Sequence, residues 1–92
     1  MALTNKEIKA LKSEAHHLKP VIRIGQKGIT ENLIQETELA LEIHELIKVH
    51  IAIDDRDVRK EAGQSVAAKT GSEIVTTIGK TCTLYRKRKS DS

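Results

Sequence analysis

The spacing of apolar residues predicts three helices that alternate with four strands. Apolar residues in the first segment recur every three or four positions, at Ile8, Leu11, Ala15 and Leu18. Thr4 and Glu7 form a capping-box pattern at the start of this segment. Pro20 disfavours a helical residue before it. The first helix is therefore expected after Thr4 and before Pro20.

The rest of the chain contains two further helical patterns and four extended runs. Strands are expected at residues 21–24, 46–53, 74–78 and 81–85. The second run alternates strictly, with Ile47, Val49, Ile51 and Ile53 on one side and Lys48, His50 and Ala52 on the other. Its polar side predicts a sheet face that is at least partly exposed to water.

The second and third helices each begin at a residue suited to capping. Thr30 can cap the second helix, whose inward face would comprise Leu33, Ile34, Thr37, Ala40 and Leu41. Asp54, Asp55 and Asp57 favour the start of the third helix, and Gly71 suits its end. The inward face of this third helix would comprise Val58, Ala62, Val66 and Lys69.

This order, α-β-α-β-α-β-β, predicts an α/β two-layer sandwich. Right-handed crossovers would make the first three strands parallel, with the helices mainly on one face of a four-stranded mixed sheet. Gly79 and Lys80 form a short turn, so the fourth strand should return antiparallel. The 92 residues suffice for one domain, expected at 1–86, with a basic and mobile tail at 87–92.

Composition excludes several classes of protein. The longest apolar run has three residues, so no segment is expected to cross a membrane. The single cysteine, Cys82, favours a core position in a cytoplasmic protein. Tyr85 is the only aromatic residue, which excludes RNA binding by base stacking on several rings.

Charge is distributed unevenly along the chain. The net charge is +4 over residues 1–30, −5 over 31–62 and +4 over 63–92. If the fold brings the two basic ends together, they form a positive surface suited to a polyanion. A generic solvated surface is the alternative.

The loop Gly25-Gln26-Lys27-Gly28 is the strongest candidate site. Two glycines three apart leave the backbone accessible, and the following helix start offers N–H groups to a phosphate beside Lys27. A plain strand-to-helix turn is the alternative. Lys80 should lie at the same sheet edge, either facing the same groove as Lys27 or as a solvated turn residue.

Two further sets of basic residues are candidates for RNA contact. Arg23 and Lys48 should project from neighbouring parallel strands on the face away from the helices. Arg86, Lys87, Arg88 and Lys89 follow the last strand and are predicted to be too polar to pack. They form either an electrostatic arm that reaches RNA or a solubilising end.

No catalytic or metal-binding pattern is present. The histidines, His16, His17, His44 and His50, lack zinc-site spacing, and the aspartates at 54–57 lack the glycine and distal glutamate of a calcium loop. No pairing for nucleophilic catalysis can be derived from the spacing. We expect neither an enzyme nor a cofactor, a metal or a small-molecule substrate.

Several motifs, in this order and spacing, resemble the CRM domain (chloroplast RNA splicing and ribosome maturation) in its stand-alone bacterial, YhbY-like form. They are HLKP at 17–20, Ile24 with GQKG at 25–28, HELIKV at 44–49, IG at 78–79 and LYR at 84–86. The resemblance implies a fold like the C-terminal domain of translation initiation factor three, with strand order 1-2-4-3. It also implies RNA contact at the GxxG loop. Gln26 is neutral where the family often has a basic residue, so Lys27 must supply the charge of the loop.

The resemblance further implies association with precursors of the large ribosomal subunit. The favoured function is therefore a monomeric, non-enzymatic protein that contacts ribosomal RNA during assembly of that subunit. An alternative is a module that docks on a ribosomal protein through the acidic second helix, with Glu31, Glu36, Glu38 and Glu42. A small enzyme that uses Asp54 and Asp55 is a distant third.

Overall fold

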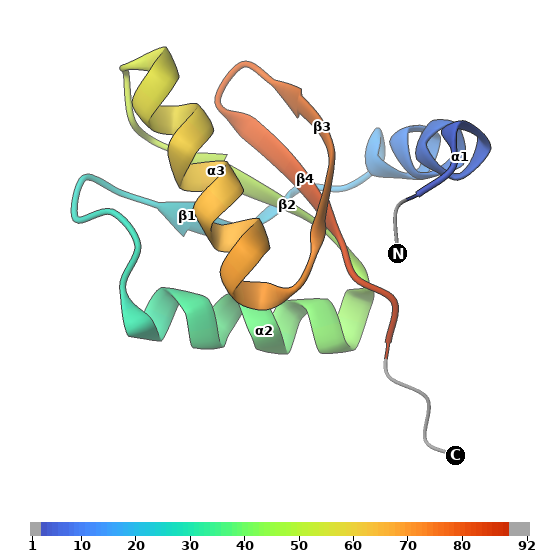
Figure 1. The fold of residues 1–92 in the computed structure, drawn as a ribbon, viewed down its shortest axis with the longest axis horizontal. Helices are drawn as coiled ribbons and strands as arrows, with labels where there is room; N and C mark the ends of the chain where they lie inside the picture. The colour runs from blue at the N-terminus through green and yellow to red at the C-terminus, as the bar shows by residue number, and fades with distance from the viewer. Residues whose placement is uncertain (1–2, 89–92) are drawn as a thin grey trace.

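The computed structural model describes residues 3–88, which form three helices and a four-stranded sheet (Figure 1). In chain order the elements are α1 (Asn5–Ala15), β1 (Pro20–Ile24), α2 (Glu31–His44), β2 (Leu46–Ile51), α3 (Arg56–Thr70), β3 (Glu73–Ile78) and β4 (Thr81–Tyr85). The predicted order of elements is confirmed. No helix within residues 3–88 has the length and apolar character needed to span a membrane.

The strand order is β1-β2-β4-β3. β1 and β2 are parallel, and β4 is antiparallel to both β2 and β3. β1, β2 and β3 therefore run in one direction, and their carboxyl ends meet at the same edge of the sheet. This is the mixed sheet predicted from the two strand–helix–strand units.

The helix ends follow the predicted capping residues. Thr4 and Glu7 form a complete capping box at α1, and these hydrogen bonds lower the pKa of Glu7. Thr30 Oγ1 accepts the Leu33 N–H at α2, and Asp55 accepts two N–H groups at the start of α3. Gly71 ends α3 with φ of 66°, a conformation that glycine adopts without steric cost.

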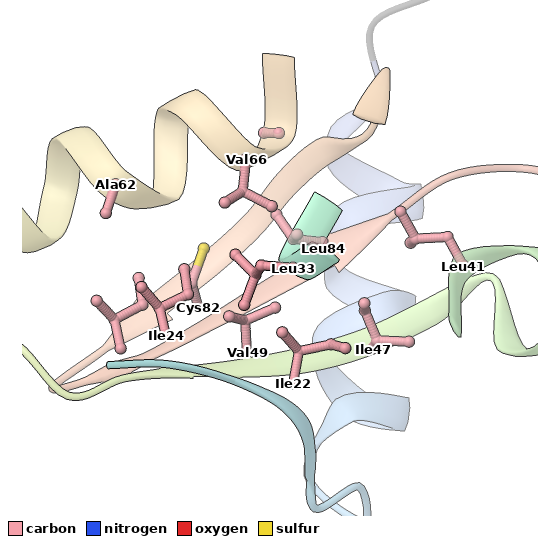
Figure 2. Close-up of a cluster of buried hydrophobic side chains, with 12 residues drawn as sticks. Ile22, Ile24, Leu33, Leu41, Ile47, Val49, Ala62, Val66, Cys82 and Leu84 are labelled. Carbon is pink, nitrogen blue, oxygen red and sulfur yellow. The ribbon is translucent and has the colours of Figure 1, made fainter. Parts of the chain in front are cut away.

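The main core lies between the sheet and the pair α2 and α3 (Figure 2). Alternate residues of β2, namely Ile47, Val49 and Ile51, are buried in it, as predicted. The predicted inward face of α2 is also confirmed, with Leu33, Thr37 and Leu41 buried. β2 is two residues shorter than predicted.

The buried face of α3 differs from the prediction. Val58 and Lys69 are exposed, whereas Gly63, Ala67 and Thr70 are buried beside Ala62 and Val66. Gly63 explains the rotation, because a Cβ built there would lie 3.4 Å from Cys82 Sγ. Small residues on this side let the helix approach the sheet, which leaves Val58 and Lys69 on the margin of the contact.

α1 lies on the opposite face of the sheet from α2 and α3. Its apolar side packs with Leu46, Val75 and Tyr85, which form a second, smaller core. Two of the three helices therefore share a face, as expected, and the third covers one end of the other face. Figure 1 shows α1 set apart from the α2 and α3 layer.

The segment after β4 is packed rather than extended. The Arg86 guanidinium donates to Glu38 Oε2 at 3.0 Å and to the Thr70 carbonyl oxygen at 2.8 Å. Arg88 donates to the carbonyl oxygens of Glu42 and Ile43 near the carboxyl end of α2. The prediction that these residues are too polar to pack is thus wrong for both arginines, because acidic side chains and free helix carbonyls provide their partners. Lys89 and the rest of the predicted tail lie outside the described residues.

Candidate nucleic-acid interface

The GQKG loop forms an open turn between β1 and α2. The Gly28 N–H donates to the Gly25 carbonyl oxygen at 3.0 Å, and Gly28 has φ of 75°. The side chains of Gln26 and Lys27 are exposed, and a Cβ built on either glycine meets no atom within 4 Å. An anion can therefore approach the loop backbone without obstruction.

Backbone hydrogen bonds hold this loop at the same edge as the β3–β4 turn. The Ala52 N–H donates to the Ile24 carbonyl oxygen at 2.8 Å, and the Ile51 N–H donates to the Lys80 carbonyl oxygen at 2.7 Å. The end of β2 thus joins the end of β1 on one side and the turn at Gly79 and Lys80 on the other. The predicted common edge is confirmed.

Lys80 is engaged by a carboxylate at this edge. Its Nζ lies 2.8 Å from Asp54 Oδ1, and this hydrogen bond and charge lower the pKa of Asp54. The groove beside Lys80 has a volume of about 710 Å³, and Lys27 is not among the described residues that line it. The structure therefore brings the two lysines to one edge but not into one groove.

The same groove contains basic residues that the sequence analysis did not single out. Arg56, Arg59 and Lys60 line it from the first turns of α3, together with Asp57. Arg59 Nη1 donates to the carbonyl oxygens of Ile53 and Asp54, which orients its guanidinium. The net charge of −5 over residues 31–62 drew attention away from these residues. The sequence nevertheless shows three cations within five positions at the start of the third helix.

Arg23 and Lys48 lie on the sheet face opposite α2 and α3, as predicted. Ile22 and Ile24 are buried on the core side, so Arg23 between them points to the other side, where it is exposed. In the β1–β2 register, Arg23 is opposite His50, and Lys48 is opposite Pro20. The two cations are thus offset by two residues of β2, a distance of ~7 Å along the strand.

α1 borders this face, whereas the sequence predicted helices mainly on the other face. Lys48 is half-buried and lines a groove of about 210 Å³ together with Lys12 of α1 and His16, the residue that caps the carboxyl end of this helix. Lys12 and His16 were not predicted as part of a site. One residue of the sequence indicates that α1 packs on this face: Leu46 is apolar, although it lies on the otherwise polar side of its strand.

The candidate residues after β4 belong to a different part of the molecule. The Arg86 side chain is 13% exposed and is held by Glu38 and Glu42. The Arg88 N–H donates to Glu45 Oε2 at 2.6 Å, while Lys87 is exposed. Arg86 and Arg88 therefore join the carboxyl ends of α2 and β4 and lie away from the GQKG edge.

The side chains with reactive or metal-binding potential are dispersed. Within residues 3–88 no three His, Cys, Asp or Glu side chains are grouped as metal ligands. Cys82 is 2% exposed, and burial raises the pKa of its thiol. It has the core position that was predicted for it.

This fold and loop define a small α/β domain with a GxxG turn at the carboxyl edge of its sheet. A family model of the CRS1/YhbY (CRM) domain matches residues 3–86, and the chain belongs to this family. The recognition made from sequence motifs is confirmed.

The chain spans most of the length of two named relatives and of one solved structure. A protein of Pseudomonas aeruginosa, named a probable RNA-binding protein, is 45% identical over 95% of this chain and 84% of its own. A probable RNA-binding protein of Bacillus subtilis is 35% identical over 97% of this chain and 93% of its own. The solution structure of a hypothetical Staphylococcus aureus protein matches with a TM-score of 0.84 and 38% identity, over 99% of this chain and 95% of that one.

Proposed function

We propose that this protein binds RNA through the GQKG edge and the adjoining face of the sheet. The observation that carries the proposal is the open GQKG turn, in a chain whose relatives from Pseudomonas and Bacillus are named probable RNA-binding proteins. A relative in Haemophilus influenzae, 42% identical over 91% of this chain, is named an RNA-binding protein.

Binding proceeds mainly through the phosphate backbone. The loop presents backbone N–H groups near the positive end of the α2 dipole, and Lys27 adds a charge beside them. Arg23 and Lys48 extend the positive surface across β1 and β2. Such contacts fix the position of the RNA and carry little sequence information. Lys80 joins the interface when phosphate displaces Asp54.

We assign Arg86 and Arg88 to the stability of the domain, since their guanidinium groups already bind helix carbonyls and carboxylates. Lys87 is exposed beside them and is free to meet RNA that extends past the domain. Fewer basic residues of the C-terminal segment are therefore available to RNA than the segment contains.

We further propose that the RNA is ribosomal and that the protein is a non-enzymatic, cytoplasmic and monomeric factor in assembly of the large ribosomal subunit. Membership of the CRM family supports this proposal. Tyr85 is the only aromatic residue, which favours contact with the RNA backbone over stacking of several bases. The buried free thiol of Cys82 is compatible with a reducing compartment.

Ultraviolet crosslinking in cells, followed by sequencing of the attached RNA, tests this target. We expect reads to concentrate in precursors of large-subunit ribosomal RNA. A variant with Lys27→Glu should lose most crosslinks, whereas Lys69→Glu on the exposed side of α3 should retain them. Reads spread evenly over cellular RNA, or concentrated in another RNA class, would contradict the ribosomal assignment.

A docking role for α2 is favoured by a separate observation. Leu39 and Ile43 lie one turn apart on this acidic helix and are 63% and 56% exposed. Their apolar surface, with Glu36 nearby, suits a basic segment of a ribosomal protein. If this function holds, Leu39→Asp with Ile43→Asp should release the protein from large-subunit precursors while its affinity for isolated RNA is unchanged.

A further inference from the structure

The groove between α1 and the sheet combines positive charge with an absence of acidic lining residues. It has a volume of about 210 Å³, and Lys12, His16 and Lys48 are its basic members. Among residues 3–88, no Asp or Glu lines it. In this respect it differs from the groove beside Lys80, which contains Asp57.

The sequence at the end of α1 places one lysine and one histidine beside this groove. Lys12 and His16 are four residues apart, so they share one side of the helix, next to the buried Ala15. Glu7 and Glu14, seven residues apart, share a different side. Lys12 and His16 therefore flank the apolar side of the helix that packs on the sheet, at the margin that borders the groove.

The strands contribute hydroxyl groups to the same groove. Thr76 of β3 is opposite Thr83 of β4 in the register, and Thr81 is two residues from Thr83 on the same face. Thr83 is 2% exposed and still lines the groove, so the groove reaches down to the surface of the sheet. Each hydroxyl can donate one hydrogen bond and accept others.

An apolar surface completes the groove. Ile78 is 67% exposed, and Ala15 and Pro20 lie on the α1 side. A ligand that fits this lining combines an anionic group, several hydrogen-bonding groups and an apolar face. The volume is below the ~300–1,000 Å³ of sites for drug-sized molecules. These requirements together describe a single nucleotide.

We propose that this groove receives one unstacked nucleotide of a single-stranded RNA segment. Lys12 and Lys48 bind its phosphate, the threonine hydroxyls bind the ribose 2′-hydroxyl and the edge of the base, and Ile78 contacts the face of the base. The inference rests on the proposed RNA binding and specifies it. Two preferences follow, for unpaired RNA over duplex and for RNA over DNA.

Fluorescence polarisation with a short labelled single-stranded RNA, the DNA of the same sequence and the RNA duplex tests both preferences. The main variant is Thr81→Val with Thr83→Val, which keeps shape and strand propensity while it removes two hydroxyls. Its control is Thr77→Val, which is paired with Cys82 on the opposite face of β3 and lines the groove beside Lys80 instead. We expect the double variant to bind single-stranded RNA about two- to tenfold more weakly than the unaltered protein does. Its affinity for DNA should equal that of the unaltered protein.

A second pair of variants tests the charge. Lys12→Ala should weaken RNA and DNA alike, while Lys6→Ala, on the same helix but outside the groove, should change neither. If Thr83→Val lowers the melting temperature, Thr76→Val alone replaces the double variant, because Thr76 is only half-buried and does not line the groove beside Lys80.

The outcomes separate the two proposals. If the protein binds RNA, but the threonine variants keep the RNA-to-DNA affinity ratio of Thr77→Val, the groove is not a nucleotide site and RNA binding stands. Equal affinity for single strands and duplex would also overturn the groove assignment. If the unaltered protein binds no RNA at all, the proposed function itself fails.

Discussion

Arg86 and Glu38 are 48 residues apart in the sequence, and their side chains form an ion pair of 3.0 Å between the segment after β4 and the middle of α2. The same guanidinium donates to the Thr70 carbonyl oxygen, the last residue of α3. One side chain therefore connects both helices of the main layer to the end of the sheet. Its fork of donors suits several acceptors at once.

Replacement of Arg86 should lower the stability of the domain rather than remove a contact with RNA. We expect Arg86→Ala to lower the free energy of unfolding by about 1–3 kcal/mol, because charged hydrogen bonds are lost and the Thr70 carbonyl is left without this donor. The free energy of unfolding of Arg86→Lys should lie between those of Arg86→Ala and the unaltered protein, since lysine retains the charge but not the planar set of donors. Urea denaturation measures both. Lys87→Ala is the control, and an equal loss in that exposed position would contradict the assignment.

The two glycines of the GQKG loop should differ in their tolerance of a side chain. Gly28 has φ of 75°, whereas Gly25 does not have a positive φ. Gly28→Ala should therefore destabilise the protein by about 1–2 kcal/mol, and Gly25→Ala by less than about 0.5 kcal/mol. For a domain of this size, 1 kcal/mol shifts the melting temperature by about 4–8 °C. Equal melting temperatures for the two variants would show that the turn adapts.

The Lys80–Asp54 ion pair predicts a specific change in titration. Asp54 has a pKa below its ordinary value of 3.8, so its pairing stabilises the fold above that pH and is lost as the pH falls through the lowered pKa. Lys80→Ala should move the pKa of Asp54 up toward 3.8, which NMR titration of its carboxyl group can follow. An unchanged midpoint would show that the pair does not form in solution.

Cys82 should be protected from alkylation in the folded protein. Burial raises the pKa of its thiol above the ordinary value of 9.0, and the side chain is 2% exposed. At pH 8 we expect iodoacetamide to react at least about a hundredfold more slowly in native buffer than in concentrated urea. Comparable rates would place the thiol at the surface.

The raised pKa of Cys82 also has a consequence for stability. The neutral thiol is favoured in the fold, so this contribution is complete below pH 9.0 and is lost as the pH rises through the higher folded value. Cys82→Ala should remove that alkaline loss. The size of its own destabilisation reports the packing of Cys82 against Gly63.

Residue periodicity and the capping residues were sufficient to predict the element order, because both are local signals. The two strand–helix–strand units and the short turn at Gly79 and Lys80 then predicted the direction of the strands. Periodicity did not predict the side on which α1 lies. The stripe of Ile8, Leu11 and Ala15 shows only that the helix has a buried face. The deciding residues, Leu46 and Val75, come from two distant strands that contact α1 through the tertiary structure.

The loop and its edge could be placed from sequence, since parallel strands bring their carboxyl ends together. The partners of the basic candidate residues could not be predicted from sequence. Lys80 meets Asp54 across 26 residues, and Arg86 meets Glu38 across 48. Such pairs depend on side-chain positions in the folded protein, which a count of charges along the chain does not contain.

The central claim is that RNA is held by phosphate contacts at the GQKG loop and on the face of the sheet that carries Lys48. The most direct test is the salt dependence of RNA affinity, measured for the unaltered protein and for Lys27→Ala with Lys48→Ala. A matched control, Lys6→Ala with Lys69→Ala, changes the net charge equally on other surfaces. We predict that the first pair lowers the log–log salt slope by about 1.4–1.8, and the control by almost nothing. Equal slopes for both pairs would contradict the claim.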